Sequence, residues 1–339
     1  MKFSDVLDIR NGRNQRQVEN ANGKYPIYGS GGVMGRATDF ICDAGTVVIG
    51  RKGSINNPLF VDEPFWNVDT AFGLVAHRDV LLPKYLFYFC VNFDFERLNT
   101  TVTIPSLTKA NLLQIEIKVP DMDEQRHVVS VLDKICRLTD LQQQELHSLD
   151  QLVKSRFIEL FGEPELNPRG LPVLPWNAVF QTTTGKLDSN AMVENGRYPF
   201  FTCAKESYKI DSYAFDCEAL LLAGNNAAGI YDVKHYKGKF NAYQRTYVLR
   251  LMNEKWSYIL FKKQLEDKLR YLQNQSKGTN TRYLTLGILN ELRFVVPPIA
   301  EQEQFAAFVE QTDKSKLAVQ KGLQELEILK KSLMQQYFG

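Results

Sequence analysis

Apolar residues recur at steps of three and four along two stretches of the chain, residues 124–162 and 301–339. This spacing places them on one stripe of a helix. Neither stretch contains proline, and glycine occurs only at their ends and at Gly322. Each stretch therefore predicts one helix of about 38 residues, roughly 57 Å long. In the first stretch the stripe consists of Val128, Leu132, Ile135, Leu138, Leu146, Leu149, Val153, Phe157 and Leu160.

The two stretches are copies of one segment. At a shift of 177 residues, Glu124-Gln125 falls on Glu301-Gln302 and Phe161-Gly162 falls on Phe338-Gly339. A single helix cannot bury its own stripe, but two copies can cover each other, so the sequence predicts an antiparallel helix pair. The residues expected to form the helix–helix packing are Leu132, Leu146, Leu149, Val153, Leu323, Leu326 and Leu329.

The repeat continues into the segments that precede the helices. Gly12-Arg13 matches Gly185-Lys186 at a shift of 173, whereas Leu107-Thr108 matches Leu284-Thr285 at 177. The second half has therefore gained four residues, most simply near residues 262–277. The expected domains are a first lobe (1–123), a first helix (124–162), a proline-rich, extended linker with a second lobe (163–300), and a second helix (301–339).

Short mixed signals inside the lobes predict an α+β fold. Strands are expected at 46–49 and 219–223, helices at 81–93 and 256–272, and closing strands at 115–119 and 292–296. The predicted architecture is thus two similar α+β lobes separated by two long antiparallel helices. These helices form a coiled-coil spacer, and the whole chain has an internal pseudo-two-fold repeat.

Composition excludes several classes of protein. No run of about 20 apolar residues is present, so no segment is expected to span a membrane. Five cysteines form no CxxC pair, which favours a reducing, cytoplasmic setting and argues against a zinc site.

Charge is unevenly spread along the chain. Residues 162–300 hold 18 basic and 13 acidic residues, whereas residues 1–123 hold 13 and 14. A nucleic-acid partner is therefore supported by charge in the second half and rests on a local patch in the first.

Motifs for catalysis are weak or missing. Gly29–Gly35 misses the GxGxxG spacing, and we expect a mobile surface loop there rather than a phosphate cradle. Asn57-Pro58-Leu59-Phe60 is similar to the motif of adenine methyltransferases, but Leu59 replaces its second proline. No P-loop, HExxH or GxSxG is present. We therefore predict no catalytic residue, no metal ligand and no cofactor site in this chain.

Two pairs of polar loops occupy corresponding places in the two lobes. Residues 50–57 and 224–229 each follow a buried strand, and residues 100–106 and 276–282 precede the closing strand. Arg, Lys and Asn suit base edges, and hydroxyl groups suit phosphates, although polar hairpin turns and solvated loops explain the same residues. A further aligned segment adds Gln244 and Arg245. The candidate DNA-binding residues are Arg51, Lys52, Ser54, Asn56, Asn57, Thr101, Thr103, Asn225, Asn226, Gln244, Arg245, Lys277, Thr279, Asn280 and Arg282.

Taken together, these features resemble the specificity subunit of type I restriction-modification systems. The resemblance rests on the lobe-helix-lobe-helix order, the Val-Pro and Glu-Gln that open each helix, and the phrases Tyr25–Gly32 and Gly50–Ile55. It implies that each lobe reads one half of a split double-stranded DNA target. It also implies that the helices set the spacing and dock modification subunits, which carry S-adenosylmethionine. Restriction subunits join them, and the specificity subunit itself is not an enzyme.

Two alternatives belong to other classes. A catalytic DNA methyltransferase or nuclease would need motifs that the sequence does not display. A coiled-coil scaffold without DNA binding would explain the helices but not the duplicated lobes. Salt-sensitive DNA binding would distinguish a recognition subunit from a scaffold.

Overall fold

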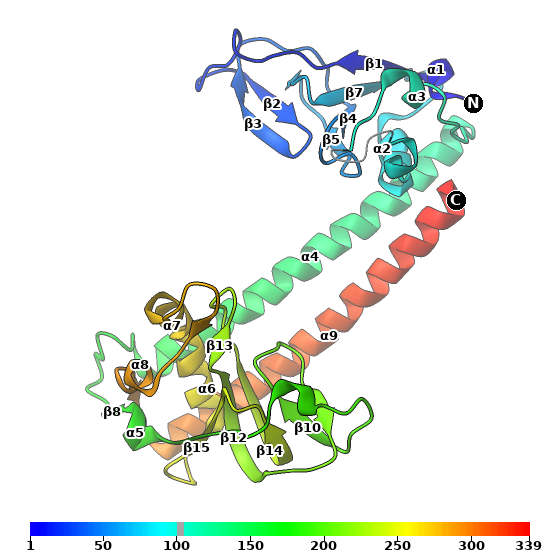
Figure 1. Cartoon of the computed structure of the whole chain (residues 1–339). Coiled ribbons are helices and arrows are strands. Elements are labelled where there is room, and N and C mark those ends of the chain that lie inside the picture. The colour runs from blue at the N-terminus through cyan, green and yellow to red at the C-terminus, as the bar shows by residue number, and fades with distance from the viewer. Residues whose placement is uncertain (100–104) are drawn as a thin grey trace. The chain divides into compact units, whose positions relative to one another are not determined.

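The computed structural model describes residues 1–99 and 105–339, which divide into two compact units (Figure 1). The first unit contains Met1–Glu145 and Val319–Gly339, and the second contains Leu146–Ala318. Two 40-residue helices, α4 (Met122–Phe161) and α9 (Ile299–Phe338), each contribute one part to each unit. The predicted long helices are therefore present, each beginning two residues earlier than expected.

In the first unit, the first lobe is built on a four-stranded antiparallel sheet in the order β1-β7-β4-β5. A smaller sheet in the order β3-β2-β6 lies in the same lobe. The strands are β1 (Leu7–Asn11), β2 (Tyr25–Gly29), β3 (Gly32–Ala37), β4 (Thr46–Gly50), β5 (Leu59–Val61), β6 (Trp66–Asn67) and β7 (Ala71–Ala76). The helices are α1 (Phe3–Val6), α2 (Pro83–Asn92), the 3-10 helix η1 (Phe95–Leu98) and α3 (Lys109–Leu112). Residues of β4, β7 and α2 share one hydrophobic core with Val128 and Leu132 of α4, which attaches the lobe to the long helix.

The second lobe contains a six-stranded sheet in the order β11-β10-β14-β12-β15-β9 and two two-stranded sheets. The strands are β8 (Val173–Pro175), β9 (Phe180–Thr184), β10 (Tyr198–Phe201), β11 (Tyr208–Ile210), β12 (Phe215–Ala223), β13 (Asn225–Asn226), β14 (Val233–Ala242), β15 (Thr246–Leu251), β16 (Arg282–Tyr283) and β17 (Arg293–Val295). The helices are α5 (Trp176–Val179), the 3-10 helix η2 (Ser189–Ala191), α6 (Tyr258–Asp267), α7 (Leu269–Gln275) and α8 (Leu286–Asn290). The order β9-β15-β12 corresponds to β1-β7-β4, so the repeat in the sequence is also a repeat of the fold.

In both long helices the buried and half-buried positions repeat every seven residues and form one line along the helix, which we call the seam. Starting at Gln125 in α4 and at Gln302 in α9, every position reached by alternating steps of three and four is buried or half-buried. Such heptad spacing is typical of coiled coils. The seam positions of α4 are 125, 128, 132, 135, 139, 142, 146, 149, 153, 156 and 160, and those of α9 lie 177 residues later.

Within each unit the parts of α4 and α9 run antiparallel (Figure 1). In the first unit, Val128 and Leu132 of α4 share a core with Leu333 and Met334 of α9. In the second unit, Phe157 of α4 packs edge-on against Phe305 of α9, with ring centroids 5.6 Å apart.

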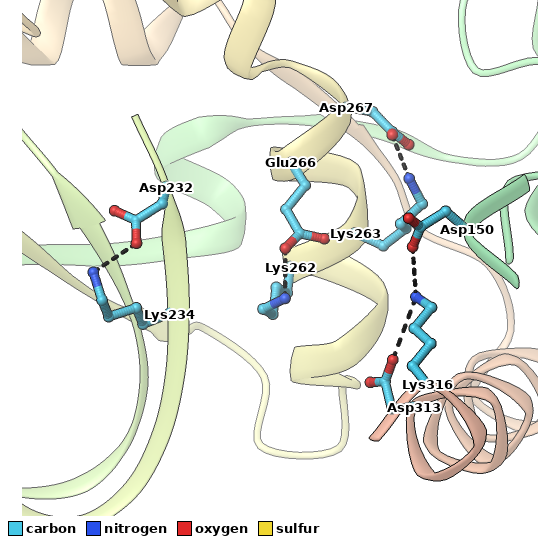
Figure 2. A network of polar contacts seen from close by, with 9 residues as sticks. All are labelled: Asp150, Asp232, Lys234, Lys262, Lys263, Glu266, Asp267, Asp313 and Lys316. Atoms are coloured by element: carbon cyan, nitrogen blue, oxygen red, sulfur yellow. Dashed lines mark hydrogen bonds and ion pairs between the residues drawn. The ribbon is translucent and has the colours of Figure 1, made fainter. Parts of the chain in front are cut away.

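A polar contact also joins the helices in the second unit. The ammonium group of Lys316, a seam residue of α9, lies 2.7 Å from Asp150 of α4 and 3.6 Å from Asp313 (Figure 2). Burial disfavours the charged ammonium, but the two carboxylates outweigh it and raise the pKa of Lys316 above its usual value.

The predicted packing residues differ in burial. Leu132 and Val153 are buried, and Leu146, Leu149, Leu323 and Leu326 are half-buried. Leu329 is instead 46 % exposed, and Leu138 of the expected stripe is 49 % exposed. Each lies one position off the seam, which passes through Thr139 and Lys330, so these two leucines were misplaced in the predicted stripe.

A buried glutamine attaches each long helix to its lobe. The Gln125 Oε1 atom accepts a hydrogen bond from Leu82 N at 2.8 Å, and its Nε2 atom donates to Val80 O and Pro120 O. In the same way, Gln302 accepts from Ser257 N at 3.0 Å and donates to Pro297 O. Both side chains are completely buried. The repeated Glu-Gln pair therefore has a structural function, because its glutamine saturates backbone groups where helix and lobe meet.

Several local predictions are corrected by the structure. The helix expected at 256–272 is two helices, α6 and α7, separated at Lys268. Residues 115–119 form only an isolated bridge between Lys2 and Glu116, because the chain turns into α1 directly after Lys2. In the second lobe, the predicted closing strand is present as β17, because the three residues of β8 pair with it, whereas only Lys2 is available in the first lobe.

Two segments predicted as a loop and as an extended linker adopt other conformations. Gly29–Gly35 lies in the hairpin of β2 and β3, in which Gly32, the first residue of β3, has a φ of +119°. The proline-rich linker is folded back rather than extended. Its Asn167 side chain bonds to both backbone groups of Leu171, and Arg169 binds Glu301 with two hydrogen bonds.

Candidate nucleic-acid interface

In the first lobe, the candidate loops meet at one edge of the main sheet, where β1 and β4 end and β7 begins. The backbone N–H groups of Arg51 and Lys52 both donate to Thr70 O, at 2.8 and 3.3 Å. On the other side, Leu107 N donates to Arg51 O, and Gly53 N donates to Pro105 O. The structure therefore brings the segment after β4 beside the segment that precedes α3, although about 50 residues of chain separate them. We call this edge the first loop edge.

The candidate side chains of the first loop edge differ in their exposure and in the contacts that they make. Arg51, Lys52, Ser54 and Asn57 are exposed. The Arg51 guanidinium lies 5.7 Å from the centre of the Phe72 ring, a cation–π distance that orients it without neutralising it. Thr101 and Thr103 lie outside the described residues.

Asn56 differs because both ends of its amide are engaged inside the lobe. Its Nδ2 atom donates to the Asp94 carboxylate at 3.0 Å, and its Oδ1 atom accepts from Phe95 N at 2.7 Å. The geometry gives Asn56 a structural task, the fixing of η1 beside the loop.

The second lobe has a corresponding edge, formed where β9 and β12 end and β15 begins. Gly224 N donates to Arg245 O at 2.8 Å, and Leu284 N donates to Gly224 O at 2.8 Å. The short strands β13 and β16 pair Asn225 with Tyr283 and Asn226 with Arg282. The three candidate segments of this lobe therefore converge, and we call this the second loop edge.

The second loop edge also mixes exposed and engaged side chains. Gln244, Arg245, Lys277, Thr279 and Asn280 are exposed, whereas Asn225, Asn226 and Arg282 are half-buried. The Asn226 Oδ1 atom accepts from Ala228 N at 2.8 Å. The Arg282 Nη1 atom donates to Gln273 O at 3.2 Å. Each of these two groups holds the loop in shape.

A glycine at the end of the central strand allows the close backbone approach in both lobes. A Cβ atom on Gly50 would lie 2.3 Å from Ser54 O, and one on Gly224 would lie 2.3 Å from Arg245 O. Side chains are excluded at both places, Gly50 by its own loop and Gly224 by the segment that precedes β15.

Among the described residues, no cluster of three or more His, Cys, Asp or Glu side chains could hold a metal ion. Burial raises the pKa of the Cys42 thiol to about 12 and that of Cys90 further, so these thiols stay protonated. Asn57 precedes β5, in which the Phe60 ring packs on Phe87 with centroids 5.8 Å apart. None of the helices in the described part of the chain combines the length and the apolar character needed to cross a membrane.

Sequence reasoning assigned no role to Gln125 and Gln302. The signal was present, because the two residues are repeat-related positions. Their burial, which gives them their structural role, could not be seen in the sequence.

These features agree with the comparisons with known proteins. The family model described as "Type I restriction modification DNA specificity domain" matches the chain twice, over residues 1–151 and 177–328. The chain belongs to this family of DNA specificity domains. The match supports a role in recognising DNA sequence and does not support the catalytic alternative.

Individual relatives point the same way. The type I restriction enzyme EcoDI specificity subunit of Escherichia coli is 38 % identical over 141 residues, which is 40 % of this chain and 30 % of that protein. A putative type I specificity subunit of Mycoplasma pneumoniae is 24 % identical over 254 residues, covering 70 % of this chain and 90 % of that protein.

Solved structures support the fold. The crystal structure of a type I restriction-modification S subunit from M. genitalium has a TM-score of 0.72 at 17 % identity, covering 100 % of this chain and 95 % of that chain. Its likeness confirms the architecture of two repeated domains with two long helices.

Proposed function

We propose that this chain is the DNA-recognition subunit of a type I restriction-modification complex. Each lobe reads one half of a bipartite double-stranded target. The long helices set the spacing of the two half-sites and dock modification subunits, with restriction subunits joining the assembly in the cytoplasm. The chain itself catalyses no reaction, and S-adenosylmethionine is bound by the modification subunits.

The observation that carries this proposal is the presence of two equivalent loop edges on repeated sheets. In both lobes a glycine ends the central strand, and polar loops from distant parts of the sequence converge beside it. The residues differ between the edges, with Arg51 and Lys52 in one and Asn225 and Asn226 in the other. A backbone arrangement that the two lobes share, with different side chains on each, suits the reading of two different half-sites.

The chemistry of the exposed side chains fits base reading and backbone contact. Arg51 and Lys52 suit the O6 and N7 acceptors of guanine, and Asn280 or Gln244 can bond to adenine through an amide. Hydroxyl groups such as Ser54 and Thr279 suit phosphate oxygens, which position the protein without reading sequence. Asn56, Asn226 and Arg282 would support these contacts by fixing the loops.

Exposed apolar side chains on the helices support the docking of further subunits. In the first unit, α4 exposes 49 % of both Leu138 and Leu141, and α9 exposes 70 % of Ile328. Leu138 and Leu141 are one helical turn apart and lie outside the buried seam. A docked subunit would cover these side chains.

The function is tested by sequencing the methylated adenines of cells with and without this chain, in the presence of its modification subunits. We expect methylation at one split sequence that disappears when the chain is removed. Methylation that persists unchanged would overturn the recognition role. Binding of S-adenosylmethionine by the purified chain alone would instead revive the catalytic alternative.

A further inference from the structure

One exposed cation in each lobe lies beside the loop edge in a repeat-related position. Arg13 follows β1 in the first lobe, and Lys186 follows β9 in the second. The preceding residue is glycine in both cases, Gly12 and Gly185. Both cations are exposed, and within the described residues neither forms an ion pair.

In the first lobe, the backbone of Arg13 is fixed on both sides. Arg13 N donates to Asn67 O at 2.9 Å, and Arg13 O accepts from the Trp66 indole at 3.0 Å. Gly12 N donates to Ala71 O, directly beside the Thr70 carbonyl that holds Arg51 and Lys52. A Cβ atom on Gly12 would lie only 1.8 Å from Val68 O. The glycine thus lets the chain that follows β1 pack against Asn67 and Val68 and present the next side chain beside the first loop edge.

The second lobe repeats this turn. A Cβ atom on Gly185 would lie 1.7 Å from Ala242 O. The following residues are held by a bridge between Leu187 and Tyr243, and Gln244 N donates to Leu187 O at 2.9 Å. Lys186 therefore lies next to the segment that holds the candidates Gln244 and Arg245.

Among the described residues, no carboxylate pairs with either cation. Arg13 lines a cavity of about 510 Å³ with Arg10, Asn11 and Trp66, in which Asp39 is the acidic lining residue. Many other lysines of the second unit are neutralised: Lys234, Lys262, Lys263 and Lys316 each pair with a carboxylate (Figure 2). The excess positive charge of the second lobe is therefore carried by unpaired groups, and Lys186 is one of them.

We propose that Arg13 and Lys186 bind DNA phosphates and set the position of each lobe on the duplex. This inference rests on the proposed DNA-recognition function. The rigid backbone and the free cation suit a fixed contact to the DNA backbone next to the loops that read bases. The position holds arginine in one lobe and lysine in the other, which indicates a phosphate contact rather than a base contact, because lysine binds phosphate as a point charge. The backbone around this position is also the same in both lobes, although the two half-sites differ.

The test measures binding of the full-length chain to a labelled DNA duplex of mixed sequence over a series of salt concentrations. Each lost phosphate contact lowers the slope of log affinity against log salt by about 0.9. We expect that decrease for Arg13→Ala and for Lys186→Ala, and about twice as much for the double variant. Arg13→Lys and Lys186→Arg should keep the wild-type slope.

Matched controls are available on each lobe. Lys118 and Lys255 are exposed, and within the described residues neither forms an ion pair. Lys118 leads into α4, and Lys255 lies beyond Leu251, at the opposite end of β15 from the second loop edge. Lys118→Ala and Lys255→Ala should leave the slope unchanged. Circular dichroism of every variant confirms that the fold is retained.

The outcomes separate this inference from the proposed function. An unchanged slope in the double variant, with steep salt dependence in wild type, would overturn the phosphate role and leave recognition standing. Wild-type binding without salt dependence would count against both. A changed half-site sequence in the methylome of Arg13→Ala or Lys186→Ala would show base reading and overturn the proposal as stated.

Discussion

At the scale of single residues, Arg51 is the sharpest test of direct base reading. Its backbone bonds to Thr70 and Leu107 do not need the guanidinium, so Arg51→Ala should fold normally. If the guanidinium grips a base with two hydrogen bonds, its removal should weaken target binding by about 1–3 kcal/mol and relax the sequence preference at one position. The measurement is a binding titration on target and single-substitution duplexes, with Lys118→Ala as the control. Unchanged affinity and unchanged preference would remove Arg51 from the interface.

The buried glutamines make a prediction about stability. Replacing Gln302 by leucine leaves Ser257 N and Pro297 O without their partner, which should cost about 1–3 kcal/mol for each group left unsatisfied. We expect a lower melting temperature for Gln302→Leu and a similar loss for Gln125→Leu. Gln304→Leu, at an exposed position two residues along the same helix, should have little effect. Equal melting temperatures for Gln302→Leu and Gln304→Leu would contradict this role.

The ion pair of Arg169 and Glu301 predicts a dependence on pH. The hydrogen bonds from Arg169 hold the pKa of the Glu301 carboxyl below its ordinary value of 4.5. A lowered folded-state pKa stabilises the fold above pH 4.5, and the gain disappears as the pH falls through the lowered value. Arg169→Gln should therefore melt earlier than wild type at neutral pH, and the difference should shrink in acid. A difference that stays constant down to acidic pH would show that charge pairing is not its cause.

At the scale of elements, the sequence predicted those helices and strands whose apolar residues form a long or strongly apolar pattern. Both long helices and the buried strands β4 and β12 were found because their patterns are long or strongly apolar. The β2–β3 hairpin was missed because β2 alternates weakly and its partner β3 begins at Gly32, whose positive φ the sequence did not reveal. Alignment of the two lobes paired their polar loops but did not predict that the loops of one lobe meet, because that meeting depends on hydrogen bonds between residues far apart in the sequence. The engagement of Asn56 by Asp94 and Phe95 was missed for the same reason.

Two glycines illustrate how the same residue type serves different elements. Gly322 lies within α9, where a Cβ atom would meet the flexible end of the Gln142 side chain at 2.7 Å. Because that amide can move, Gly322→Ala should stabilise the chain by about 0.5–1 kcal/mol through helix propensity. Gly12→Ala should instead destabilise it strongly, since its Cβ atom would meet backbone at 1.8 Å. Melting temperatures of both variants test this contrast, and a destabilised Gly322→Ala would show that Gln142 is held in place.

At the scale of the whole molecule, the repeat has diverged unevenly. The seam of the helices keeps its register at a shift of 177 residues through eleven positions of each helix. In the described part of each lobe, the main sheets have instead acquired different numbers of strands, and the polar loops differ as well. The frame that joins lobe to helix is thus retained twice, while the surfaces proposed to read DNA have separated. This division is what a subunit with two different half-sites requires.

The helices are proposed to act as a ruler, and the seam defines how to change its length. Each unit holds parts of both α4 and α9, so both helices must be lengthened together. Seven residues inserted after Gln142 and seven after Val319 keep the heptad in phase and add about 10.5 Å. At about 3.4 Å per base pair, the gap between half-sites should grow by about three base pairs, with both half-site sequences unchanged. Two-residue insertions at the same places would turn the seam by about 200° and should disrupt folding. Mapping methylated adenines for wild type and the seven-residue variant decides the matter, because an active variant with an unchanged gap would show that the helices do not measure it.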